Sequence, residues 1–379
     1  MRQISTFAVA ILAPAALTAG PAPGEEYSTE KVDVATSIVA EGLDHPWGLD
    51  FLPDNTAIVT ERSGTLRLVG ADGTLSNPVE GVPEVFARGQ GGLLDVAVAK
   101  DFAQSGRIFF TFSEPGRGGA GTAIASARLV RQSPAARLED MQVLFSMPKK
   151  TAKGQHFGSR IVLHPDGTVF FTTGDRGEGP RAQDIADAAG AVLRINADGS
   201  VPADNPYASG QGGALPQIWS KGHRNPQGFA IDAQGTLWTV EHGAQGGDEV
   251  NNPRAGRNYG WPKISYGQNY GGGQIGVGSA APGFEQPVHY WDPSIAPSGL
   301  VVYEGDMFPE WKGDLIAGAL KFQLLSRLDR DDSGAITGEE RMFEGEFGRI
   351  RDVNVAPDGS LWLLTDEDNW RIVRVGRKE

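Results

Sequence analysis

Cysteine is absent from this chain of 379 residues. Its absence excludes disulfides, thiolate metal sites, a cysteine nucleophile and a lipid-modified cysteine. Histidine is also scarce, with six residues in the whole sequence, so a catalytic base has few candidates.

Positive charge is in deficit as well. There are 34 Lys and Arg residues against 47 Asp and Glu residues, which gives a formal net charge of -13. Nucleic acids and anionic membrane surfaces bind to positively charged faces, so we expect neither as a partner. A cluster of arginines in this acidic background would therefore be informative.

Long apolar runs are missing except at the N-terminus. There Arg2 is followed by an apolar run from Ile4 to about Leu17 and then by small residues. This order is typical of a cleavable secretory signal, and the run is too short to span a bilayer comfortably. We predict that residues 1–24 are a signal peptide and flexible N-terminus, that the mature protein is periplasmic, and that it does not insert into the membrane.

Glycine and proline are abundant, at 52 and 24 residues, and they separate short runs rich in Val, Ile, Leu, Phe and Trp. Six segments share one pattern, in which a strand, a Pro/Asp/Gly-type turn and a second strand follow each other. They begin at Trp47, Gly92, Ser159, Gln227, Ser298 and Arg351. Repeated hairpins that each need a neighbour to bury one face favour closure into a ring. The sequence therefore predicts an all-β fold, with residues 25–379 forming a single six-bladed β-propeller; a β-sandwich is the alternative.

Two histidines, His156 and His164, lie close together in GQHFGSRIVLHPDG. His164 occupies the hairpin turn, in the position that Leu52 and Ala356 fill in other repeats, so we assign it to the turn. His156 lies just before the strand. In a propeller the segments that enter the innermost strands meet at one rim of the central axis, so polar residues there converge.

The corresponding positions in other repeats are also polar, and several are basic. A single arginine or histidine in a loop is usually solvated, but here such residues recur in four repeats. They are Gln90, His156, Arg224, Asn225, Arg349 and Arg351. Because guanidinium groups pair with carboxylates and phosphates through two parallel hydrogen bonds, we predict an axial site for an anion with several such groups. A neutral His156 among them could accept a proton from a substrate hydroxyl.

Several longer motifs occur in order between about Val34 and Arg374. They are GQGGLLDVA, GQHFGSRIVLHPDG, GAVLRINADGSVPADNP, KGHRNPQG, EHGAQGGDEVNNP followed by RNYGWP, APSGLVVY, GALK, and GRIRDV with LTDEDN. Together they resemble the soluble PQQ-dependent aldose sugar dehydrogenases of the glucose/sorbosone dehydrogenase family. The resemblance implies a six-bladed propeller that binds pyrroloquinoline quinone (PQQ), a tricarboxylate ortho-quinone, over the axis.

The resemblance also implies a role for each matched residue. His156 would remove the proton of the sugar C1 hydroxyl while hydride passes to the quinone, and an external acceptor would receive the electrons. Gln90 would lie beside the cofactor. The carboxylates and carbonyls of PQQ would be held by Arg224, Asn225, Lys321, Arg349 and Arg351. We expect a monomer or a homodimer.

Calcium is the second cofactor that the resemblance implies. One Ca²⁺ would bind the main-chain carbonyls of Gly243 and Ala244, where glucose-oxidising relatives carry Gly-Pro. A further ion would be held by Glu249 and the Tyr259 region, although a polar turn would also explain Glu249. Two other positions also differ from the glucose-oxidising relatives. One is Gln155, which precedes His156, and the other is Arg176. Both bear on the substrate rim and suggest a range of aldoses broader than glucose.

Other motifs are weaker. Residues 329–340, DRDDSGAITGEE, match the spacing of an EF-hand loop, but their flanks resemble strands instead of the required helices. The GGGQIG segment, 271–276, lacks the strand and helix of a dinucleotide site, so we expect a flexible loop. We expect Trp238 and Trp362 to pack inside the fold, and Trp291 is the candidate for a sugar-contacting rim residue.

Two alternative functions stay open. A calcium-dependent lactonase on a six-bladed propeller would need carboxylate and Asn ligands on the axis, whereas the axial candidates here are mainly cationic. A non-catalytic propeller that binds an anionic glycan or a protein would retain the arginines but would not need His156.

Overall fold

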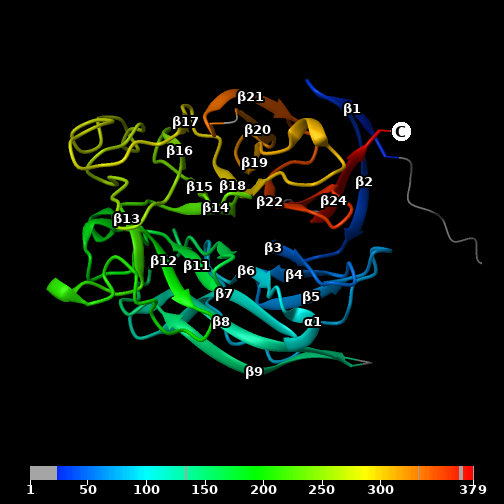
Figure 1. Ribbon diagram of the computed structural model, residues 1–379, viewed down its shortest axis with the longest axis horizontal. Helices are drawn as coiled ribbons and strands as arrows, with labels where there is room; N and C mark the ends of the chain where they lie inside the picture. The colour runs from blue at the N-terminus through cyan, green and yellow to red at the C-terminus, as the bar shows by residue number, and fades with distance from the viewer. Residues whose placement is uncertain (1–23, 133–134, 332, 367–369, 379) are drawn as a thin grey trace, which may run out of the picture.

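The computed structural model describes residues 24–132, 135–331, 333–366 and 370–378. These residues form six antiparallel sheets that follow one another around the middle of the molecule (Figure 1). The all-β, six-bladed β-propeller is thus confirmed. Residues 1–23 of the predicted signal peptide lie outside the described residues. Within the described part, no helix has the length and apolar character needed to cross a membrane.

The six blades take their strands in chain order. Blade 1 contains β3 (Pro46–Phe51), β4 (Ala57–Glu61) and β5 (Thr65–Val69), and blade 2 contains β6 (Leu93–Val98), β7 (Arg107–Gly116), β8 (Gly119–Gln132) and β9 (Ala135–Ser146). Blade 3 contains β10 (Ile161–Leu163), β11 (Thr168–Thr173), β12 (Ala191–Asn196) and β13 (Ile218–Lys221), and blade 4 contains β14 (Pro226–Ile231), β15 (Leu237–Glu241), β16 (Asp248–Asn251) and β17 (His289–Trp291).

The last two blades include strands from both ends of the chain. Blade 5 contains β18 (Pro297–Val302), β19 (Leu315–Ala319), β20 (Leu325–Arg330) and β21 (Ile336–Met342). Blade 6 contains β22 (Ile350–Val355), β23 (Leu361–Thr365), β24 (Arg371–Arg377), β2 (Asp33–Glu41) and β1 (Glu26–Ser28). The short helices are α1 (Phe102–Ser105), η1 (Gly179–Gln183), η2 (Gln211–Gly213) and η3 (Pro309–Trp311).

Each predicted hairpin is the inner pair of strands of one blade. In blade 3, β10 and β11 pair with Val162 opposite Phe170, and the turn between them contains His164, as expected. Gly167 has a φ of 88°, which only glycine adopts without strain, and Asp166 accepts the Thr168 amide at 2.8 Å. The turn chemistry therefore fixes the register of the two strands.

The ring closes through non-covalent contacts at two levels. Each inner strand contacts the inner strands of its two neighbouring blades, including β22 with β3. In addition, β2 from the N-terminal end pairs antiparallel with β24 from the C-terminal end, with Val34 opposite Arg377. Strands from both ends of the chain therefore belong to one sheet, and β24 has a hydrogen-bonded neighbour on each side.

The apolar core lies between the blades. One cluster of buried side chains occupies each gap between neighbouring blades, for example Leu52 and Ile58 of blade 1 against Phe110 and Phe112 of blade 2. The second strands β4, β11, β15, β19 and β23 are buried along their whole length because both faces of each sheet are covered. Closure of the ring therefore completes the core by burying the cluster between blades 6 and 1.

Arg160 crosses the propeller axis and connects several blades. Its guanidinium donates to Asp95 of blade 2 at 3.1 Å, to Asp352 of blade 6 at 2.8 Å and to the main-chain carbonyls of Gln227 and Arg351. Arg160 is only 4% exposed. A buried cation with this many acceptors holds the inner strands in one arrangement.

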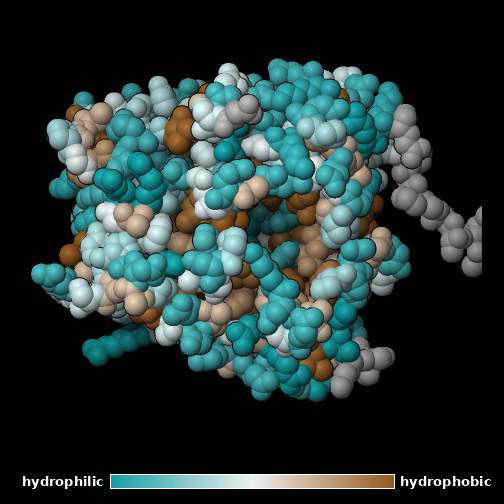
Figure 2. Space-filling view, viewed as in Figure 1, coloured by the Kyte–Doolittle hydropathy of each residue, from teal (hydrophilic) through white to brown (hydrophobic). Residues whose placement is uncertain are grey.

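On the hairpin-turn side of Arg160, a central cavity of about 360 Å³ is lined by the ends of the inner strands, including Asp50, Asp95 and Asp352. Figure 2 shows a hollow near the middle of one face, with apolar side chains around it. Burial raises the pKa of Asp50 to about 6 and that of Asp95 to about 7, although Arg160 opposes the second shift. The cationic candidates predicted from the sequence belong to the other rim, and the three carboxylates on this side of the axis were not predicted.

Candidate active site

His156 is held by residues from the two neighbouring blades. It lies before β10 with a φ of 55°, in the left-handed region, and its amide donates to Gln90 Oε1 at 2.7 Å. Gly158, with a φ of 63°, donates its amide to Asn225 Oδ1 at 3.1 Å. A non-glycine residue rarely adopts such a φ unless its surroundings impose it. Gln90 and Asn225 therefore fix the conformation that aims the imidazole.

A carboxylate orients the His156 ring. The Nδ1 atom lies 2.6 Å from Asp175 Oδ1, and Asp175 Oδ2 accepts the indole N–H of Trp261 at 2.8 Å. Because an ionised carboxylate only accepts, Nδ1 carries the proton and Nε2 holds a free lone pair. Among the described residues, no side chain or main-chain group hydrogen-bonds to Nε2.

The surroundings keep this imidazole neutral. Burial lowers the pKa of His156; the hydrogen bond to Asp175 opposes the shift, and the positive charge of Arg224 adds to it. Burial raises the pKa of Asp175, but the hydrogen bonds from His156 and from the Gly177 amide outweigh it, so the pKa of Asp175 lies below its ordinary value. Near neutral pH the pair is therefore an imidazole beside a carboxylate.

Contacts between polar side chains continue from this point around the axis. Gln227 donates to Asn225 Oδ1 at 3.4 Å and accepts from Arg351 at 3.4 Å, and Arg351 donates to Asp366 at 2.6 Å. These contacts join blade 4 to blade 6 on the rim that carries His156.

Arg349 extends the same set of contacts towards blade 5. It donates to Asp366 at 3.4 Å and to the main-chain carbonyl of Leu320 at 3.3 Å. The neighbouring Lys321 is exposed, with Nζ 5.5 Å from the ring centroid of Phe322. Arg349 and Arg351 thus share Asp366 and place two guanidinium groups on this part of the rim.

Arg224 lies on the other side of His156, above Trp261 at 5.2 Å from the ring centroid. Its guanidinium makes only long contacts, with the His242 carbonyl at 3.3 Å and the Tyr270 hydroxyl at 3.4 Å, and its Nε is buried without a partner in the described structure. The Nδ2 atom of Asn225 is likewise buried and unpaired there. Two orphaned donors beside a buried histidine fit a site that binds an acceptor-rich ligand.

The predicted axial residues thus lie on one rim and are connected through blades 2 to 6. Those that the contacts above bring together are Gln90, His156, Arg224, Asn225, Arg349 and Arg351. Lys321 adjoins this group through Leu320, and Gln90 and Lys321 are its exposed members.

Three of the four residues predicted to hold calcium line a neighbouring cavity. A space of about 10 Å³ is bordered by Gly243, Glu249 and Tyr259, together with Glu241, but Ala244 is not part of its lining. A cavity of this size holds about one water-sized species. The Tyr259 hydroxyl donates to a main-chain carbonyl and accepts the amide of Arg254, so only its carbonyl would be free to bind a cation.

Two glutamates at this cavity share one amide donor. Asn251 donates to Glu241 at 2.9 Å and to Glu249 at 3.0 Å, while its own Oδ1 is buried with no partner among the described atoms. Burial, followed by the charge of Glu241, raises the pKa of Glu249 to about 8. Glu241 and Glu249 supply oxygen ligands of the kind that Ca²⁺ prefers, but Arg224 also lines the cavity, and the described residues contain no group of three or more acidic or histidine side chains that could hold a metal.

Arg176 does not lie at the rim, so the expectation that it shapes substrate access is wrong. Its side chain is fully buried, stacks on Phe157 at 3.4 Å from the ring centroid, and donates to the main-chain carbonyls of Lys153 (2.7 Å) and Gln155. Burial and the charge of Arg181 lower the pKa of Arg176 to about 9. Arg176 therefore supports the loop that carries His156, through hydrogen bonds to its main-chain carbonyls.

Trp291, the tryptophan expected at the rim, does not lie there, and Trp261 does. Trp291 is 3% exposed and donates to Glu339 at 2.9 Å, so it is a packing residue, whereas Trp261 lies at the site. Trp238 and Trp362 are buried in inter-blade clusters, as predicted.

The EF-hand resemblance has a structural explanation. Residues 329–330 end β20 and residues 336–340 belong to β21, so the flanking strands are confirmed. Asp331 accepts the amides of Ser333 and Ala335, and Asp329 pairs with Arg327 at 2.6 Å. The acidic residues therefore shape a hairpin. Residues 271–276 form a loop, as expected.

Sequence reasoning missed several residues of the site. Asp175, Trp261, Gln227 and Asp366 orient or pair with predicted residues. Asp175 follows the second strand of the same blade as His156, which is a usable signal, because that position returns to the rim from which the inner strand starts. Trp261 comes from a long connection whose path the sequence does not indicate.

Comparison with known proteins gives a consistent result. The family model described as Glucose / Sorbosone dehydrogenase matches residues 43–374. Aldose sugar dehydrogenase YliI of Escherichia coli (strain K12) is 42% identical over 353 residues, which cover 90% of this chain and 92% of that protein. The crystal structure of the soluble aldose sugar dehydrogenase from Escherichia coli in the apo-form has a TM-score of 0.87 and 42% identity, covering 91% of this chain and 100% of that chain. The PQQ-bound aldose sugar dehydrogenase from Streptomyces coelicolor has a TM-score of 0.74 and 29% identity, covering 94% of this chain and 100% of that chain.

Proposed function

The chain belongs to the glucose/sorbosone dehydrogenase family, and we propose that it oxidises the C1 hydroxyl of aldose sugars to the lactone with PQQ as cofactor. The observation that carries this proposal is the neutral His156, oriented by Asp175 and lying beside the unpaired donors of Arg224 and Asn225. Electrons would leave through an external acceptor.

His156 would act as the general base. With Nδ1 donating to Asp175, the Nε2 lone pair is available to accept the proton of the sugar C1 hydroxyl. Asp175 keeps the ring in the correct tautomer and stabilises the imidazolium that forms, because the carboxylate lies next to the new charge. Trp261 and the Gly177 amide hold Asp175 in turn.

The basic residues of the rim would hold PQQ. Arg224, Asn225, Lys321, Arg349 and Arg351 supply cationic and amide donors, which suit a tricarboxylate. Bound PQQ would supply the hydride acceptor for the C1 hydrogen. The unpaired Arg224 Nε and Asn225 Nδ2 support this assignment, because a bound acceptor would satisfy both.

Calcium would bind in two places. The Gly243 and Ala244 carbonyls, in the loop after β15, would hold an ion at the cofactor, where it could polarise a quinone carbonyl as a Lewis acid. Glu249 and the Tyr259 carbonyl would hold another in the small cavity. Two features support this second position: the unpaired Asn251 Oδ1, and the closeness of Glu241 and Glu249, which accept from the same Asn251 amide.

The location of the protein is part of the proposal. The N-terminal pattern of residues 1–24 supports export to the periplasm and removal of the signal. N-terminal sequencing of the mature protein from the periplasmic fraction tests this, since an intact Met1 would contradict it.

Reconstitution tests the main proposal. Purified apo-protein is titrated with PQQ with and without Ca²⁺, and dye reduction is then measured with a panel of aldoses. We expect calcium-dependent PQQ binding and aldose-dependent dye reduction. No PQQ binding at micromolar concentrations would overturn the proposal. His156→Ala should retain PQQ binding and lose turnover, whereas near wild-type turnover in that variant would show that His156 is not the base.

A further inference from the structure

Two blades carry the same hairpin with one informative difference. The turn of blade 4 reads DAQGTLW and that of blade 6 reads APDGSLW, and the two register patterns place Trp238 and Trp362 in equivalent positions. In the same register Asp232 of blade 4 corresponds to Ala356 of blade 6. The two tryptophans therefore differ in their surroundings.

In blade 4 the tryptophan is fully satisfied by its neighbours. Asp232 accepts the indole N–H of Trp238 at 3.0 Å, and the same oxygen accepts from Arg330 of blade 5 at 3.2 Å. The guanidinium of Arg330 also lies 4.4 Å from the Trp238 ring centroid. Together the carboxylate and the guanidinium cover the tryptophan between blades 4 and 5.

In blade 6 Trp362 has neither a carboxylate like that of Asp232 nor a covering guanidinium like that of Arg330 among the described residues. Alanine replaces the aspartate, and the indole N–H of Trp362 has no hydrogen-bond partner within the described ranges. The cationic side chain next to it, Arg374, pairs with Asp358 at 2.8 Å instead of covering the ring. A cavity of about 580 Å³ opens at this position, a volume within the range of small-molecule sites.

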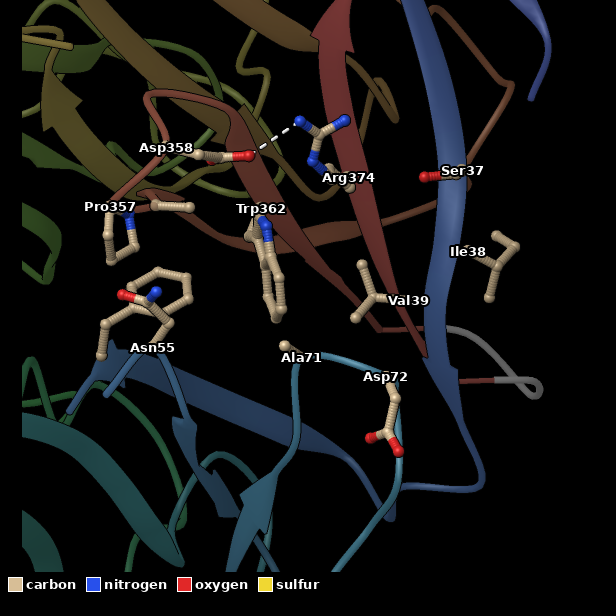
Figure 3. A pocket seen from close by; sticks show the side chains of 12 residues that line it. Ser37, Ile38, Val39, Asn55, Ala71, Asp72, Pro357, Asp358, Trp362 and Arg374 are labelled. Carbon is tan, nitrogen blue, oxygen red and sulfur yellow. Dashed lines mark hydrogen bonds and ion pairs between the residues drawn. The ribbon is translucent and has the colours of Figure 1, made fainter. Parts of the chain in front are cut away.

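The cavity, called the blade 6/1 pocket below, lies between blade 6 and blade 1. Its lining residues are Ser37, Ile38, Val39, Phe51, Asn55, Ala71, Asp72, Ala356, Pro357, Asp358, Trp362 and Arg374. Figure 3 shows Trp362 in the wall of the pocket, with Asn55 and Pro357 on one side and Val39 and Ser37 on the other. Phe51 packs edge-on against Trp362 at 5.0 Å between ring centroids.

The charged groups of the lining sum to one negative charge. Asp358 and Arg374 pair with each other, Asp72 adds a second carboxylate, and the side chains of Asn55 and Ser37 make no hydrogen bond with other described residues. A strong anion is therefore not favoured. Trp362 is 7% exposed, so only a small part of the indole borders the pocket, beside the apolar side chains of Val39 and Pro357. Apolar walls beside indole N–H, amide, hydroxyl and carboxylate groups suit a ring molecule with apolar C–H faces and many hydroxyls.

We propose that the blade 6/1 pocket is a second ligand site, which binds a neutral carbohydrate ring against Trp362 with its hydroxyls on Asn55 and the Asp358–Arg374 pair. The pocket lies at the hairpin turns, on the rim opposite His156, so it is separate from the candidate active site. The proposal does not depend on the proposed function, because the ligand is bound and not converted.

Binding of methyl β-D-glucopyranoside tests the proposal. Its C1 oxygen is methylated, so it cannot be oxidised to a lactone at that carbon. Binding is measured by calorimetry and by saturation-transfer NMR on the full-length mature protein. Ala356→Asp copies the carboxylate of blade 4 and should capture the Trp362 N–H, and we expect at least a tenfold loss of affinity. Asn55→Ala, at an exposed turn position, should also weaken binding.

The matched control is Ala233→Asp, which adds the same side chain to the exposed turn of blade 4 and should leave affinity unchanged. Dehydrogenase activity should stay unchanged in all three variants. Thermal unfolding checks that Ala356→Asp folds. Trp362→Phe keeps an aromatic ring and removes the N–H, so it tests the same contact by a second variant and should also weaken binding. The proposal is overturned if the glycoside does not bind, or if Ala356→Asp and Asn55→Ala both bind it like the wild type.

Discussion

The Nδ1 atom of His156 lies 2.6 Å from Oδ1 of Asp175, and both side chains are almost completely buried. The two residues come from the beginning and the end of the same hairpin of blade 3. The fold therefore places a general base and the group that orients it on one rigid unit, while Gln90 and Asn225 from neighbouring blades fix the backbone around the base.

Asp175→Asn should lower kcat by about 10²- to 10⁴-fold, the range usual for loss of assisted proton transfer. The amide would no longer hold the ring in the tautomer with a free Nε2. PQQ affinity should change little, because the hydrogen bond that Asp175 makes with a predicted cofactor residue runs from its main-chain amide to the Arg224 carbonyl, and asparagine keeps that amide. Steady-state kinetics and a PQQ titration measure the two quantities separately.

A matched control lies in the same blade. His164 and Asp166 form a similar pair at 2.8 Å, but at the hairpin turn. Asp166→Asn should leave kcat unchanged. Equal losses in both variants would show that the effect of Asp175→Asn is structural.

The pH profile should reflect the lowered pKa of His156. The base must be neutral, so kcat/KM should be constant around neutral pH and fall as the pH drops through the pKa of His156 in the folded protein. Burial places that pKa below the ordinary value of 6.5, so the midpoint of the acid limb should lie below 6.5. Initial rates in buffers of constant ionic strength measure it, and a midpoint above 6.5 would contradict the assignment.

Arg351→Met should weaken PQQ binding by roughly 10- to 100-fold, since a hydrogen bond to a charged group contributes about 1.5–3 kcal/mol. Arg351→Lys should recover part of the loss because it keeps the charge but not the planar pair of donors. Arg341→Met is the control, as Arg341 lies on the outer strand β21. Equilibrium titration followed by absorbance measures all three, and equal affinity in Arg351→Met and wild type would remove Arg351 from the cofactor site.

Arg160→Met should destabilise the propeller strongly. It leaves Asp95 and Asp352 buried without their cation, and loss of one partner of a buried ion pair typically costs about 3–5 kcal/mol. The free energy of unfolding in urea measures the effect.

Two further variants test the cause. The triple change Arg160→Met, Asp95→Asn, Asp352→Asn should regain much of the stability. The control Arg131→Ala removes an exposed ion pair with Asp54 and should change the free energy of unfolding by less than about 1 kcal/mol. A small loss in Arg160→Met would show that the axis tolerates the unpaired carboxylates.

Much of the fold could be predicted because each blade is a local unit. Period-2 alternation and turn residues such as Asp166 and Gly167 specify a hairpin within about a dozen residues, and repetition implies a ring. The partner of each hairpin could not be predicted in detail. The pairing of β2 with β24 joins segments at opposite ends of the chain, and no local pattern records it.

The candidate site divides in the same way. The sequence by itself determined the repeat, the rim on which polar residues gather, and the choice of His156 over His164, because all three follow from position within a hairpin. Only the tertiary structure decided that Asp175 and Trp261 orient His156 and that Arg176 is buried beneath the same loop. It also decided that Trp362 borders a pocket, whereas Asp232 and Arg330 contact Trp238. Those outcomes depend on which side chains of separate blades meet, and such long-range contacts arise only when the ring closes.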